Sequence, residues 1–250
     1  MFSFRPPPVT ARRRILNLCI LCVMSVSSVG LSGAAFARVQ TPTLYLYLAG
    51  PGVFLDDASA YGAARKARIA ELVEIHGWPV KVEGLYPLDN EIADFAPDRQ
   101  TGLRIYHANM AQIERAHAVI ANMVRFRSPS MDVGTAFEMG VARGMNKPVF
   151  GYYDAVPFYG RADFGEGGAD GSAAFEPPSY AQRVARYYDL AEEQPDKDPD
   201  GLNVEHFAMT DNLMLLGALD DSRSDIAASF DAAVISAVEL LLAEQAVPSR

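Results

Sequence analysis

Short apolar runs with no regular polar alternation constrain the fold of this sequence more than any other feature. Three of them are clear: LYLYLA at residues 44–49, AVIANMV at 118–124 and PVFGYY at 148–153. They are too short for buried helices and rich in β-branched and aromatic residues, which is typical of strands. Strands that are apolar on both sides belong to parallel sheets with helices on both faces. The sequence therefore predicts an α/β fold with a doubly wound parallel sheet.

Segments with helical periodicity and one further strand lie around these runs. Asp57 is placed to cap a first helix that Gly77 ends, and the spacing of apolar residues after Gly77 predicts one more strand and three more helices. We expect a strand at 80–85 and helices at 101–115, 134–144 and 225–244. Ligands of such sheets bind beyond the carboxyl ends of the strands, so the polar residues that follow each strand are candidates for a site.

Between residues 154 and 201 the composition changes. Glycine, proline and acidic residues alternate there, as in FGEGGADGSAAFEPPS and EEQPDKDPDG. Such a segment cannot bury much apolar surface, so we interpret it as a long surface insertion with one helix near residues 180–190. The rest of residues 38–250 is predicted to form a single domain.

The first 37 residues have the pattern of a signal peptide. Three consecutive arginines, Arg12 to Arg14, precede an apolar run at 15–31, and Ala35-Phe36-Ala37 matches a cleavage site. We expect export to the periplasm or the medium, through either the general or the twin-arginine route. A membrane-spanning helix is the alternative for the apolar run, and a misassigned start codon would leave the protein in the cytoplasm.

Charge and cysteine content limit the partners of the mature chain. Cleavage after Ala37 would remove four of the 22 basic residues and none of the 31 acidic ones, which leaves a net charge of −13. Such a surface repels nucleic acid polymers and anionic membranes. Cys19 and Cys22 both precede the cleavage site, and the four histidines lack paired metal-ligand spacing. We therefore expect no disulfide and no metal site.

Two carboxylates flank a Gly-Thr pair where a loop is expected to become a helix. In MDVGTAFEMG, Asp132 precedes Gly134 and Glu138 follows it, and apolar residues border both acids. We place Glu138 in or near the first helical turn, where the helix dipole would keep it ionised. An acid at a helix start can also serve only to stabilise the helix. A carboxylate nucleophile with a second acid or base nearby is the arrangement of retaining glycosyl transfer.

Five short segments together resemble the nucleoside 2-deoxyribosyltransferase family. They occur in the family's order along the chain and cover much of residues 44–153 with a short later piece. The segments are YLAGPGVF at 47–54, YPLDN at 86–90, AVIAN at 118–122, MDVGTAFEMG at 131–140 and DNLM at 211–214.

The resemblance implies roles for individual residues. Glu138 would attack the anomeric carbon of a 2′-deoxyribonucleoside, Asp132 would bind the base and carry its proton, and Tyr47 would orient Glu138. Asn212 would hold sugar hydroxyls across a subunit interface. The remaining candidates for substrate contact are Asn109, Asp89, Gly50 and Gly134.

The same resemblance implies a flavodoxin-like sheet in a homo-oligomer with shared sites, acting on deoxynucleosides and nucleobases without a metal or organic cofactor. Some members have an aspartate where this chain has Asn109, which cannot carry a proton. Asp89 lies in a turn sequence and can equally be structural.

Two other functions remain open at this point. Water could take the sugar in place of a second base, which would make the protein a nucleoside or deoxynucleotide N-glycosidase with the same glutamate. A non-catalytic nucleoside-binding module is the alternative outside enzymes, although a binding module has no need of a nucleophile.

Overall fold

The computed structural model describes residues 41–154 and 178–246. The expected signal segment, residues 1–37, and much of the glycine-rich run at 155–177 lie outside this part of the chain. All described residues belong to one compact unit, Gln40–Arg250. Within the described residues, no helix has the length and apolar character needed to cross a membrane.

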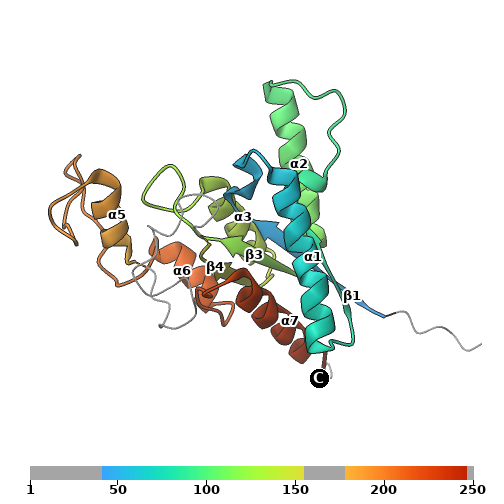
Figure 1. The fold of residues 1–250 in the computed structure, drawn as a ribbon. Helices are drawn as coiled ribbons and strands as arrows, with labels where there is room; N and C mark the ends of the chain where they lie inside the picture. The colour runs from blue at the N-terminus through green and yellow to red at the C-terminus, as the bar shows by residue number, and fades with distance from the viewer. Residues whose placement is uncertain (1–40, 155–177, 247–250) are drawn as a thin grey trace, which may run out of the picture. The chain divides into compact units, whose positions relative to one another are not determined.

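A parallel sheet of four strands forms the centre of the described structure. The strands are β1 (Thr43–Ala49), β2 (Lys81–Leu85), β3 (Ala118–Asn122) and β4 (Val149–Tyr152), and their order in the sheet is β2-β1-β3-β4. β1 pairs in parallel with both β2 and β3, and β3 pairs in parallel with β4. The predicted α/β class with a doubly wound parallel sheet is confirmed (Figure 1).

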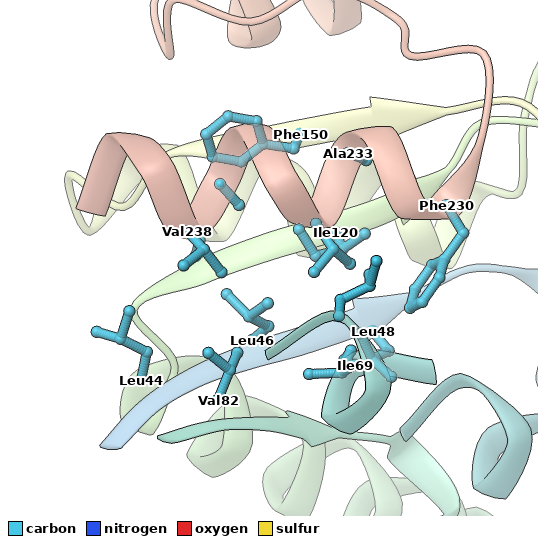
Figure 2. Close-up of a cluster of buried hydrophobic side chains, with 14 of the residues drawn as sticks. Leu44, Leu46, Leu48, Ile69, Val82, Ile120, Phe150, Phe230, Ala233 and Val238 are labelled. Carbon is cyan, nitrogen blue, oxygen red and sulfur yellow. The ribbon is translucent and has the colours of Figure 1, made fainter. Parts of the chain in front are cut away.

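Helices cover both faces of this sheet. One face packs against α1 (Ala58–His76) and α7 (Phe230–Ala246), and the other packs against α2 (Arg99–Arg115), α3 (Val133–Gly144) and α6 (Leu213–Asp220). Figure 2 shows the first of these two layers, in which side chains of all four strands point toward α7 and α1.

Side chains of β1 alternate between the two layers. Leu44, Leu46 and Leu48 contribute to the α1/α7 layer, as Figure 2 shows, whereas Tyr47 and Ala49 contribute to the α2/α3 layer. This alternation follows from the period of two in a strand. Tyr47 is completely buried as a result, on the side of the sheet where α3 lies.

Several predicted helix ends differ from the structure. The last helix begins at Phe230 and not at 225, because Ala227 forms an isolated parallel bridge to Tyr152 and its amide donates to Gly151 O at 2.8 Å. The α2 helix begins at Arg99, since the Asp98 side chain accepts a 2.8 Å bond from the Thr101 amide. Asp57 precedes α1 as expected, but its side chain makes no capping bond.

The described part of the predicted insertion contains α5 (Tyr180–Tyr188), close to the expected helix. The expectation that the insertion buries little is wrong for this helix, which buries Ala181, Val184 and Ala185 together with the charged Arg183. Composition could not show this, because the acidic and glycine-rich neighbours outnumber the few residues that pack.

Candidate active site

A cavity of about 890 Å³ opens at the carboxyl ends of β1 and β3. These two strands are neighbours, and the chain turns to opposite sides of the sheet after each, so the position is the switch point where such folds bind ligands. Two segments form its inner wall. One is Gly50 with the short helix η1 (Pro51–Phe54) after β1, and the other is the start of α3.

Gly50 allows the turn that leads from β1 into the cavity wall. Its φ is +149°, and a Cβ atom on it would lie 2.9 Å from the Cβ of Asn122 at the end of β3. Any side chain at this position would therefore force apart the two strand ends that frame the cavity.

Glu138 of α3 lies against Tyr47 of β1. The Tyr47 hydroxyl donates a 2.6 Å hydrogen bond to Oε1 of Glu138, which is half-buried and lines the cavity. Burial, reinforced by the neighbouring carboxylate, raises the pKa of Tyr47 well above its usual range. Tyr47 thus remains a hydrogen-bond donor throughout the ordinary pH range and fixes one oxygen of Glu138.

Burial raises the pKa of Glu138, the hydrogen bond from Tyr47 lowers it and the negative charge of Asp132 raises it, and the net result is a pKa of about 7. The prediction that a helix start keeps Glu138 ionised is wrong, because α3 begins at Val133 and Glu138 lies in its second turn. The helix dipole acts mainly within the first turn. Glu138 is therefore a carboxyl group that titrates near neutrality.

Asp132 caps the start of α3. Its Oδ2 accepts bonds from the Thr135 amide at 2.8 Å and the Thr135 hydroxyl at 2.9 Å. Within the described residues no donor bonds Oδ1, so this oxygen is available in the cavity. A Cβ on Gly134 would lie 3.1 Å from Oδ2, which makes glycine the residue that leaves the cap undisturbed.

Asn109 and Asn90 bring amide groups to the opposite wall. Asn90 Nδ2 donates to Asn109 Oδ1 at 3.2 Å, and both residues line the cavity. Asp89 has a different position. Its carboxylate accepts from the Tyr86 amide at 3.0 Å and from Lys66 Nζ, and it does not line the cavity. The structure thus favours a structural role for Asp89, within the short helix η2 (Pro87–Asp89).

Comparison with known proteins identifies the family. The model of the family described as nucleoside 2-deoxyribosyltransferase matches residues 46–214, well over half of the chain. The chain belongs to the nucleoside 2-deoxyribosyltransferase family. The matched range contains every segment on which the resemblance was based, and family members transfer deoxyribose of nucleosides.

The chain is also similar to several solved structures. A 2-deoxyribosyltransferase from Leishmania mexicana is 27% identical, with a TM-score of 0.50, over 78% of this chain and 97% of its own. A conserved protein from Enterococcus faecalis V583 is 17% identical over 79% and 99%, with a TM-score of 0.46. A 2-deoxyribosyltransferase from Bacillus psychrosaccharolyticus is 19% identical over 44% and 72%, with a TM-score of 0.33. No curated protein matches.

Asn212, which the family resemblance assigns to the sugar, lies outside the cavity of its own chain. Its Oδ1 accepts from the Met214 amide at 3.0 Å as the cap of α6, and its Nδ2 donates to Glu205 Oε1 at 2.7 Å. Within a single chain of this family member, Asn212 and Glu138 are therefore not brought together.

The mouth of the cavity contains residues that the sequence analysis missed. Phe54 and Phe126 stack with ring centroids 5.0 Å apart, and the Arg127 guanidinium lies 4.9 and 4.6 Å from these rings. Arg127 has a φ of +56°, a conformation that no feature of its sequence indicates. Further apolar residues that line the cavity are Val53, Leu88, Ile92, Phe95, Ile105 and Val133.

Metal ligands are not gathered in the described part of the chain. No group of three or more His, Cys, Asp or Glu side chains in that part is arranged to hold a metal ion.

Proposed function

We propose that this family member transfers 2-deoxyribose between nucleobases by a retaining double displacement, with Glu138 as the nucleophile. The observation that carries this proposal is the grouping of Glu138 and Asp132 at the wall of one cavity, with the buried Tyr47 bonded to Glu138. A nucleophilic carboxylate needs an exposed lone pair and a fixed direction. Tyr47 bonds only Oε1, so Oε2 is left to approach the sugar.

The proposed reaction has two displacements. Glu138 attacks the anomeric carbon, the bond from that carbon to the base nitrogen breaks, and Asp132 delivers a proton to the departing base. The sugar is then an ester of Glu138. A second base attacks the same carbon, Asp132 removes its proton, and the carboxylate of Glu138 leaves. Two inversions at one carbon give overall retention.

The lining of the cavity supports a nucleoside as the substrate. Its two carboxylates, Glu138 and Asp132, lie on one wall, and apolar side chains form much of the remaining lining. A flat base fits apolar walls, and the amides of Asn90 and Asn109 can donate to and accept from its edge. Since Asn109 carries no titratable proton, we assign proton transfer to Asp132 alone.

A second copy of the chain is proposed to complete the site. Large apolar side chains beside the cavity are exposed on α2, α3 and the loop before α2. They are Phe95, Ile105, Tyr106, Val133 and Phe137. Val133 is 82% exposed, and such a cluster is typical of a protein interface. The interface would exclude water and bring Asn212 of a neighbouring copy to the sugar.

Hydrolysis is the second candidate, since the rim of the cavity in a single chain is exposed to water. Phe95 at this rim is 68% exposed. Without a covering partner or a bound second base, water would reach the glycosyl ester.

Export of the mature chain, with cleavage after Ala37, is a separate proposal from the leader sequence. It would place the enzyme where it salvages external nucleosides.

The deciding experiment incubates residues 38–250 with 2′-deoxyinosine, with and without adenine, and separates the products by chromatography. Deoxyadenosine formed only with adenine is the expected result. Equal release of hypoxanthine and free deoxyribose in both tubes would make the protein a hydrolase. No reaction across a panel of deoxynucleosides would contradict both and favour a binding module. Glu138→Ala should abolish turnover and leave the far-UV circular dichroism spectrum unchanged.

A further inference from the structure

A buried ion pair beneath the cavity joins three segments that are distant in the sequence. Arg183 of α5 is 2% exposed and Asp211, just before α6, is 1% exposed. Arg183 Nη1 donates to Asp211 Oδ2 at 2.6 Å and to Thr210 O at 2.9 Å, and Nη2 donates to Met123 O at 2.9 Å.

The carboxylate of Asp211 makes further bonds toward the cavity. Oδ2 accepts from the Met131 amide at 3.0 Å, and Oδ1 accepts from the Ser130 hydroxyl and from the Asn212 amide at 2.8 Å. The carboxylate thus has four partners on three chain segments, and one of them, Arg183, is a charged donor.

These bonds hold both ends of the connection from β3 to α3. This connection begins at Met123, directly after β3, and ends beside Met131, shortly before α3. The ion pair bonds the main chain at both residues. Asp132 follows Met131 directly, and Asn212 follows Asp211 directly. Asp132 and Asn212, which are both expected to contact the substrate, are therefore each adjacent in the chain to a residue that the ion pair holds in place.

We propose that Arg183 and Asp211 are positioning residues, which set Asp132 at its distance from Glu138 by holding the connection from β3 to α3. Apolar side chains could attach α5 to the sheet equally well, and burying two charges is costly. Unlike apolar contacts, the ion pair forms hydrogen bonds with defined directions, and one of them holds the backbone at Met131, beside Asp132. The catalytic meaning of this inference rests on the proposed function.

The test compares Arg183→Lys and Ser130→Ala with Arg186→Met. Lysine keeps the charge at 183 but lacks the planar fork that bonds Asp211, Thr210 and Met123 together. Ser130→Ala removes one bond to Asp211 and retains the ion pair, so it tests the proposal even if the lysine variant does not fold. Arg186 lies on the same helix and is exposed, which makes it the matched control.

Two readouts separate positioning from a general loss of structure. The first is the titration of the Glu138 carboxyl carbon by NMR without substrate, which is independent of activity. Among the residues that the structure describes, Tyr47 and Asp132 are the groups that act on the pKa of Glu138 besides burial, so movement of Asp132 away from Glu138 lowers this pKa. The second is turnover, where we expect kcat to fall about 10- to 100-fold in Arg183→Lys, with a smaller change in KM.

The expected result is a lower pKa of Glu138 in Arg183→Lys and Ser130→Ala and an unchanged one in Arg186→Met. An unchanged Glu138 titration in both test variants would overturn the inference. If the wild-type protein transfers no deoxyribose but the titration shifts as expected, the proposed function fails and the positioning role stands.

Discussion

Tyr47 and Glu138 are 91 positions apart in the sequence, yet the tyrosine hydroxyl donates to the glutamate at 2.6 Å. The tyrosine comes from the central strand β1 and the glutamate from α3, which packs on that face of the sheet. The pKa of Glu138 depends on opposing effects of its surroundings. Burial and Asp132 favour the protonated carboxyl group of Glu138, and Tyr47 favours the carboxylate.

Replacing Tyr47 tests this balance. Tyr47→Phe removes the bond that lowers the pKa of Glu138, so the pKa should rise above about 7. The acidic limb of the pH profile of kcat/KM should move to higher pH. A bond to a charged group contributes about 1.5–3 kcal/mol, so activity at pH 7 should fall about 10- to 100-fold. Tyr45→Phe, on the same side of the same strand, is the control. An unshifted limb would contradict the assignment of Tyr47.

Glu138 should also link stability to pH. Its pKa in the folded protein, about 7, exceeds the ordinary value of 4.5, so between these two pH values the folded state holds a proton that the unfolded chain releases. The resulting stabilisation is complete below pH 4.5 and is lost as the pH rises through 7. Above pH 7 the wild-type protein therefore carries a poorly solvated charge.

Glu138→Gln removes this titration. Its free energy of unfolding relative to wild type should increase between pH 4.5 and 8, by roughly 1–3 kcal/mol. Urea unfolding at both pH values measures this change in the free energy of unfolding. The control is Glu239→Gln, at an exposed position of α7. A difference that is the same at both pH values would show that Glu138 has an ordinary pKa.

Asp132→Asn separates capping from proton transfer. Asparagine caps helices as well as aspartate does, so the melting temperature should change little. Loss of the charge should lower the pKa of Glu138. Transfer from 2′-deoxyinosine to adenine should nonetheless slow by about 10²- to 10⁴-fold, because the base loses its proton donor. Wild-type turnover in this variant would exclude Asp132 as the proton carrier.

Gly50→Ala should destabilise the fold, because the new Cβ would approach Asn122 Cβ to 2.9 Å at an unfavourable φ. We expect a loss of about 1–3 kcal/mol in the free energy of unfolding. Gly102→Ala is the matched control, since a Cβ there meets no atom within 4 Å and the residue is in α2. A helical Gly→Ala change should raise stability by up to about 1 kcal/mol. Equal stability of both variants would argue against steric crowding at Gly50.

The sequence was sufficient for most of the sheet and for one side of the site. Apolar runs predicted β1, β3 and β4 because buried parallel strands have a local signature. Asp132 and Glu138 were found because they lie close together on one segment, and Tyr47 was found through the family resemblance.

Other features depend on contacts between distant segments and have no local signature. Arg183 lies in a polar, acidic region of the sequence, and its burial is favourable because of distant partners that include residues 123, 210 and 211. The pKa of Glu138 was misjudged for the same reason. Its position relative to the helix start could be counted, but its burial depends on the packing of α3 against β1.

The alternation of β1 has a consequence for how this enzyme can change over time. Tyr47 reaches α3 only because it is an odd-numbered residue of a strand whose leucines face the other layer. Insertion or deletion of one residue ahead of it would turn a leucine toward Glu138 and the tyrosine toward α7. A single substitution in β1 alters one side chain, whereas a change in the length of β1 would disrupt both the hydrophobic core and the contact between Tyr47 and Glu138.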